Sequence, residues 1–239
     1  MKPFRISPLI QLAIGLTLIS PTLAQEISLG SSAVAPDGGV DGWSSNMIIR
    51  EEAIHINSTL VDQAASGVTF EFAVGNPRSR VTPFIVQIND VNMNGDFTDD
   101  NDFKVLHIGT TRVAGVDYDA AGVVSFDYSD GDTAFLIPAG TAIGAGYMDC
   151  DPDGLGGEAG SVIPFEGGNT PGEMWYAGNA GETHPNPIEI GTVLSGDPAA
   201  SVDNRNYQFS IDVNLGEVGD ADGDGMPTEF AEMFDFLSA

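Results

Sequence analysis

The chain has 239 residues, of which 35 are acidic and only 8 are basic, and its formal net charge is −27 at pH 7. A surface this acidic repels nucleic acid and anionic lipid, and the sequence contains no basic patch that would bind either of them. Hydrophobic residues make up 42% of the chain, which is enough for a packed core and excludes a disordered acidic tail.

Residues 1–24 have the pattern of a secretory signal peptide. Lys2 and Arg5 supply a positive start, residues 9–19 are an apolar run, and Ala24 is a small residue suited to signal peptidase. The apolar run is shorter than the ~20 residues that a membrane span requires. We therefore expect cleavage after Ala24 and a secreted protein, extracellular or periplasmic, with no membrane span.

From residue 25 onward, short stretches of alternating apolar and polar residues are separated by turns rich in Gly and Pro. In the stretch 53–56, Ile54 and Ile56 are expected to alternate with His55 and Asn57, with His55 facing solvent. The close spacing of such stretches predicts an all-β fold, an antiparallel β-sandwich of the jelly-roll kind, over residues 25–214. The predicted strands are 26–29, 47–49, 53–56, 68–74, 82–88, 103–108, 122–128, 133–137, 143–148, 161–165, 174–176, 188–194 and 207–213.

Three acidic loops share the pattern D-x-[DN]-x-[DN]-G, in which side-chain oxygens occupy alternate positions ahead of a glycine. Calcium takes roughly 6–8 oxygen ligands, and the glycine permits the sharp turn that wraps the loop around an ion. The predicted cofactor is therefore calcium. The candidate ligands are Asp90, Asn92, Asn94, Asp96 and Asp102 in the first loop, Asp149, Asp151 and Asp153 in the second, and Asp220, Asp222, Asp224, Glu229 and Glu232 in the third.

The third loop leads into a predicted helix, so residues 215–239 are expected to form a calcium-binding loop and a short helix. Phe230, Met233, Phe234 and Leu237 fall at i, i+3, i+4 and i+7 and make one apolar stripe. A helix this short is marginal alone in water. It is therefore expected to dock, either on the sandwich or on another molecule.

Each acidic loop has an alternative interpretation as an Asx-rich turn without a metal, because Asp and Asn favour turns on their own. Clustered carboxylates that lack a cation repel one another and cost stability, which favours calcium for the first and third loops. The second loop fits less well because Pro152 stiffens it.

The sequence around the first loop, from Val86 to Asp102, resembles the signature of GEVED-type domains, which are extracellular bacterial β-sandwich modules. The matching run is Asp90 to Asp99, and Asp102 stands where the closing acid of that signature falls. Asn94 replaces the usual Asp. The tail 220–232 resembles the D-x-D-x-D-G-x-P repeats of thrombospondin type 3 and dockerin-like calcium modules. Both resemblances imply a calcium-binding extracellular module.

Two further sets of residues suggest a carbohydrate ligand. Trp175 and Tyr176 are candidate ligand-binding residues that would offer an aromatic platform to a sugar ring, although large aromatic side chains are more often buried in a core. A glycosidase would need two facing carboxylates, and acidic residues of the same region are available for that role. The four candidates are Glu166, Glu173, Glu182 and Glu189.

Taken together, these patterns predict a secreted bacterial calcium-binding β-sandwich module without catalytic residues, serving adhesion, matrix assembly or glycan binding. Its expected partner is a glycan, an extracellular matrix component or a cell surface. The alternative is a carbohydrate-active enzyme or the accessory module of one.

Overall fold

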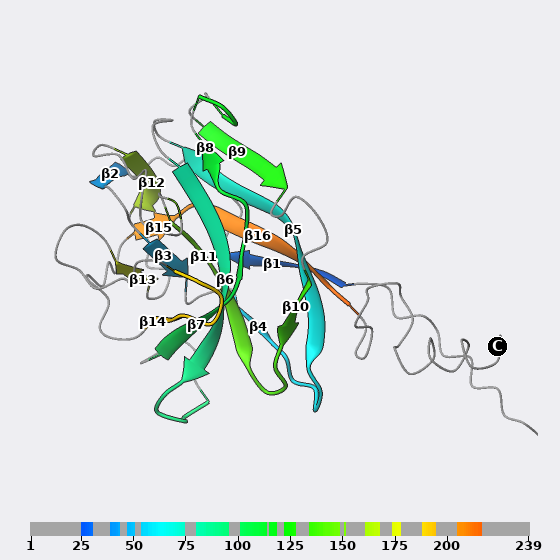
Figure 1. The fold of residues 1–239 in the computed structure, drawn as a ribbon. Coiled ribbons are helices and arrows are strands. Elements are labelled where there is room, and N and C mark those ends of the chain that lie inside the picture. Colours follow the sequence, from blue (N-terminus) through cyan, green and yellow to red (C-terminus); the bar gives the residue numbers. More distant parts are fainter. Residues whose placement is uncertain are drawn as a thin grey trace, which may run out of the picture.

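The computed structural model describes parts of the chain between residues 25 and 216 (Figure 1). The predicted signal peptide and the predicted C-terminal loop and helix lie outside the described residues. The described ranges are 25–30, 39–43, 47–50, 54–74, 80–95, 101–113, 115–118, 122–127, 134–148, 151, 161–167, 174–177, 188–194 and 205–216.

The described residues form β-strands and no helix, and the strand pairs are antiparallel. The first sheet has the order β1 (Gln25–Gly30), β16 (Phe209–Leu215), β5 (Gln63–Val74) and β10 (Ala134–Ile137), and β9 (Gly122–Asp127) also pairs with β5. The second sheet has the order β13 (Met174–Ala177), β3 (Met47–Arg50), β11 (Ala142–Met148), β6 (Arg80–Asp90), β7 (Asn101–Ile108) and β14 (Val193–Leu194), with β4 (His55–Ile56) on β11 and β8 (Arg112–Val113) on β6. A small third sheet has the order β15 (Arg205–Tyr207), β12 (Ser161–Gly167) and β2 (Gly39–Trp43).

The first two sheets pack face to face over one hydrophobic core. Phe70 and Phe72 of β5 stack with their ring centroids 5.1 Å apart, and Tyr147 of β11 meets the edge of Phe209 of β16 at 4.8 Å. Ile85 of β6 is fully buried in the same cluster. The all-β sandwich predicted from the sequence is confirmed.

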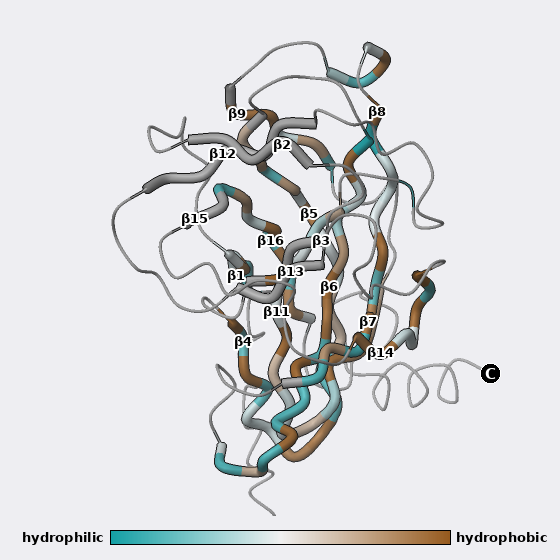
Figure 2. Tube along the Cα trace, turned by 90° about the vertical axis from the view of Figure 1, so that its left-hand side faces the viewer, coloured by the Kyte–Doolittle hydropathy of each residue, from teal (hydrophilic) through white to brown (hydrophobic). Residues whose placement is uncertain are grey.

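The central strands β6 and β11 of the second sheet are buried on both faces. Along β6, Val81 and Ile85 face the core between the sheets, while Phe84, Val86 and Ile88 belong to a second buried cluster on the other face. In Figure 2 the hydrophobic parts of the chain accordingly run along β6 and β7. A strand covered on both sides needs apolar residues at nearly every position, which explains why residues 81–86 are buried without interruption.

The alternation predicted for residues 53–57 is wrong. Ile56 is 47% exposed, whereas Asn57 is 1% exposed. The reason is hydrogen bonding: the Asn57 amide donates to the carbonyl oxygens of Val61 (3.1 Å) and Ile137 (2.9 Å), and its oxygen accepts from the backbone N–H of Thr59 (3.1 Å). These bonds hold the 57–62 turn against the end of β10.

Other predictions also differ from the structure in detail, here and elsewhere in the chain. His55 is half-buried rather than facing solvent, and its Nε2 lies 3.1 Å from Oε1 of Gln63. The strand predicted at 188–194 is mostly a turn, with Thr192 N–H donating to the Glu189 carbonyl at 2.9 Å, and only β14 remains extended. The sequence pattern missed β2 and β8, and β16 ends at Leu215, one residue past the predicted edge of the sandwich.

Gly30 closes β1 in a conformation that side chains rarely adopt. Its φ is +98°, and a Cβ added there would collide with the carbonyl oxygen of Phe209 on the neighbouring strand. Gly140, in the turn before β11, also has a positive φ, +71°, but has no atom within 4 Å of such a Cβ.

These two glycines give a matched test of the packing between β1 and β16. Gly30→Ala is expected to lower the free energy of unfolding by more than the ~1–3 kcal/mol of backbone strain alone, because the strand must also shift. Gly140→Ala should cost only the strain. Urea denaturation followed by circular dichroism measures both values, and equal losses would contradict the close approach of β1 to Phe209.

Candidate functional site

The first acidic loop connects β6 to β7, as the sequence predicts. The last ladder pairs before the loop join Asn89 to Asp102 and Asp90 to Asn101. The loop is therefore the tip of a hairpin, and its first candidate ligand is the last residue of a strand held between β11 and β7.

The first half of this loop curls around the carboxylate of Asp90. Its Oδ2 accepts a hydrogen bond from the backbone N–H of Gly95 at 2.6 Å, and its Oδ1 accepts one from that of Asn94 at 3.2 Å. The amide oxygen of Asn92 also accepts from the N–H of Asn94, at 3.1 Å. Met93 and Gly95 both adopt positive φ, 58° and 82°, which bends the backbone through this turn.

This arrangement suits a hard cation. Oxygens of Asp90 and Asn92 converge on neighbouring amides, so the two side chains lie on the same side of the loop. A carboxylate oxygen has more than one lone pair, so the Asp90 oxygens can accept from a backbone amide and also bind a metal ion. Carboxylate and amide oxygens are also the ligands that calcium prefers.

The structure describes only one of the two remaining acidic candidates of this loop. Asp102 lies on β7 and is half-buried. Asp96 falls outside the described residues. Within the part of the chain that is described, no three His, Cys, Asp or Glu side chains gather as a metal-binding group.

The second loop contributes one described residue. The Oδ2 atom of Asp151 lies 2.6 Å from an Nη1 nitrogen of Arg80 and forms an ion pair with it. This carboxylate therefore already has a positive partner, which the sequence pattern did not predict. Asp149 and Asp153 lie outside the described residues, as do the third-loop candidates Asp220, Asp222, Asp224, Glu229 and Glu232.

Most of the carbohydrate-related candidates have no described side chain. Trp175 and Tyr176 lie in β13, opposite Ile49 and Ile48 of β3, and their side chains are not among those described. Of the four glutamates considered as catalytic carboxylates, only Glu189 has a described side chain, and it is exposed on the turn before β14.

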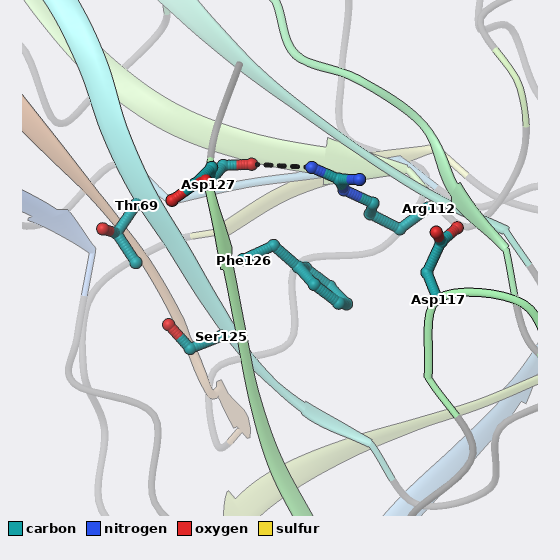
Figure 3. A pocket seen from close by; sticks show the side chains of 6 residues that line it. All are labelled: Thr69, Arg112, Asp117, Ser125, Phe126 and Asp127. Carbon is teal, nitrogen blue, oxygen red and sulfur yellow. Dashed lines mark hydrogen bonds between the residues drawn. The ribbon is translucent and has the colours of Figure 1, made fainter. Parts of the chain in front are cut away.

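A hollow that the sequence analysis did not identify lies beside the edge of β9 (Figure 3). Its volume is about 410 Å³. Its lining comes from four separate segments of the chain, so no local motif could have indicated it. The sequence feature that could have pointed to this hollow was Arg112, because basic residues are rare in this chain, with only 8 in the sequence. The lining residues are Thr69, Arg112, Asp117, Ser125, Phe126 and Asp127.

His107 of β7 is a buried titratable group away from both of these sites. It is 3% exposed, and its ring stacks on Phe135 with centroids 5.5 Å apart and planes 14° apart. Burial disfavours the charged imidazolium and lowers the pKa of His107 below 6.5. Its environment is that of a core residue.

Comparison with family models, with curated proteins and with solved structures finds no match for this chain. Over the described residues, no helix is long and apolar enough to cross a membrane.

His107 makes stability depend on pH. Because its pKa is lowered in the folded state, the unfolded chain takes up this proton first, and stability falls as the pH drops below about 6.5. The loss is at most about 1.4 kcal/mol per pH unit, the limit for one proton. Melting temperatures at pH 7.5 and 5.5 should differ less in His107→Gln than in the wild type. An unchanged difference in His107→Gln would contradict this assignment.

Proposed function

We propose that this protein is a secreted, non-catalytic β-sandwich module that binds calcium at the β6–β7 hairpin and serves adhesion, matrix assembly or glycan binding. The observation that carries the calcium part is the loop around Asp90, whose carboxylate is held by two backbone amides at 2.6 and 3.2 Å. The secreted location rests on the signal-peptide pattern of residues 1–24.

Asp90, Asn92, Asn94 and Asp102 are the described residues that would hold the ion, and Asp96 is a further oxygen in the pattern. When bound, calcium would supply positive charge to a loop whose following residues include Asp99 and Asp100. Residues 90 to 95 already hold the bent backbone that the first half of such a loop needs.

Binding at this position would stabilise the whole sandwich rather than the loop alone. Asp90 is the last residue of β6, and β6 contributes to the clusters on both faces of the second sheet. An ion that binds the folded chain and not the unfolded one adds about 2.7 kcal/mol of stability at a concentration 100-fold above Kd. Calcium is thus proposed as a structural cofactor.

The third acidic loop would supply further calcium sites, and the neighbouring apolar stripe Phe230, Met233, Phe234 and Leu237 would give the module a docking element. These parts of the proposal rest on the sequence pattern alone. Expected partners are glycans, matrix components or cell surfaces.

Asp90→Asn tests the calcium site directly. Asparagine keeps one oxygen, which can accept one of the two backbone hydrogen bonds, and it removes the negative charge that attracts the ion. In EDTA the variant should therefore melt below the wild type by the loss of that one hydrogen bond, and excess calcium should raise the melting temperature of the wild type by more than that of the variant. Calorimetric titration should show the loss of one binding event or a weakening of at least about tenfold, which is 1.4 kcal/mol.

Glu26→Gln is the matched control, because it removes one negative charge from an exposed position on β1. It should retain the calcium response of the wild type. An equal calcium response in wild type and Asp90→Asn would leave the loop as an Asx-rich turn, and no response to calcium in the wild type would remove the cofactor altogether.

A further inference from the structure

Asn94 is followed by Gly95, and this is the single Asn-Gly pair in the sequence. An asparagine side chain can react with the backbone nitrogen of the next residue and form a five-membered succinimide ring. A side chain on that next residue hinders the approach, and glycine has none. Of all the asparagines in this chain, Asn94 therefore has the least hindered neighbour.

The surroundings of this pair are open. Asn94 and Gly95 are both exposed, so water reaches them. Beyond its chain neighbours, no atom lies within 4 Å of a Cβ built on Gly95, and its φ is +82°, which side chains rarely adopt. Asn57, by contrast, is 1% exposed, and its amide donates to the carbonyls of Val61 and Ile137. The two asparagines thus differ in access as well as in the residue that follows.

A carboxylate contacts the nitrogen that would react. The backbone N–H of Gly95 donates to Oδ2 of Asp90 at 2.6 Å. A carboxylate at this distance can take the proton as the nitrogen attacks, which is general base catalysis. The other oxygen of Asp90 accepts from the N–H of Asn94 at 3.2 Å, so the carboxylate is held beside both residues of the pair.

We propose that Asn94 is a site of self-catalysed deamidation. The Gly95 nitrogen forms a bond to Cγ of Asn94 while its proton passes to Asp90, and that proton leaves with the side-chain nitrogen as ammonia. Water then opens the succinimide at one of its two carbonyl carbons. Opening at Cγ gives aspartate, and opening at the backbone carbonyl carbon gives isoaspartate. Each conversion consumes one water and releases one ammonia.

Deamidation changes the proposed calcium loop, and this part of the inference rests on the proposed function. Aspartate at position 94 replaces a neutral amide with a carboxylate, which attracts calcium more strongly. Isoaspartate adds a carbon to the main chain and disturbs the alternate spacing of the ligands. A bound ion would occupy the Asp90 carboxylate and withdraw the base from Gly95. Calcium should therefore protect Asn94, and the loop should age only while it is empty.

The test follows the purified protein in EDTA over several weeks at physiological temperature and neutral pH. Trypsin releases residues 81–104 as one peptide, because it cuts after the basic residues on either side. Fragment-ion mass spectrometry locates the replacement of –NH2 by –OH, and an isoaspartate-specific methyltransferase measures the second product. Asn94 should convert at least about tenfold faster than Asn92 of the same loop and than the buried Asn57.

Two variants examine the role of Asp90 as the base. Asp90→Asn removes the proton acceptor and should slow the conversion of Asn94 in EDTA at least about tenfold. Glu26→Gln removes an exposed charge on β1 and should leave the rate unchanged. An equal rate in Asp90→Asn and the wild type would overturn this role. The comparison of Asn94 with Asn92 needs no variant, so it holds whatever Asp90→Asn does to the fold.

Calcium separates this proposal from the proposed function. At a concentration 100-fold above Kd about 1% of the sites are empty, so conversion should slow by up to about 100-fold. Asn94→Asp, which carries the aspartate product from the start, should bind calcium more tightly than the wild type in calorimetric titration. Equal rates in calcium and EDTA would contradict the calcium site and leave the deamidation standing. Conversion of Asn94 no faster than that of Asn92 in EDTA would overturn the deamidation itself.

Discussion

The structure depends on the burial of β6 on both of its faces. Ile85 packs into the core between the two large sheets, while its neighbours Phe84 and Val86 pack into the cluster on the opposite face, and all three are fully buried. Because a strand in this position cannot move without disturbing two cores, its ends are fixed points. The acidic loop begins at one end, and β8 with Arg112 pairs at the other.

Repulsion between acidic side chains acts against this apolar packing. An excess of 35 acidic over 8 basic residues opposes compaction, since like charges on a folded surface lie closer together than in an unfolded chain. Among the described residues, Arg80 pairs with Asp151, and Arg112 lies between the edge of β9 and the turn that carries Asp117. The proposed calcium ion would have the same role at the β6–β7 hairpin.

The sequence predicted most strands because alternation and Gly or Pro boundaries are local signals. It also predicted that the loop after Asp90 joins two strands. It failed at Asn57, where a polar side chain is buried because its amide donates to the carbonyl of residue 61 in the same turn and to that of the distant residue 137. It could not predict the Arg80–Asp151 pair or the hollow at Arg112, since both depend on segments brought together only by strand order.

The pairing of β1 with β16 has a consequence for how the chain reaches this fold. Ser28 is hydrogen-bonded to Asp212, a residue 184 positions later, and the ladder extends from Gln25 to Gly30 along the whole of β1. Sheets that join such distant segments form slowly, because the entropy of closing a long loop must be lost before the contacts are gained. β1, the first described strand, therefore waits for β16, the last described one, and its edge stays unprotected against wrong partners throughout that delay.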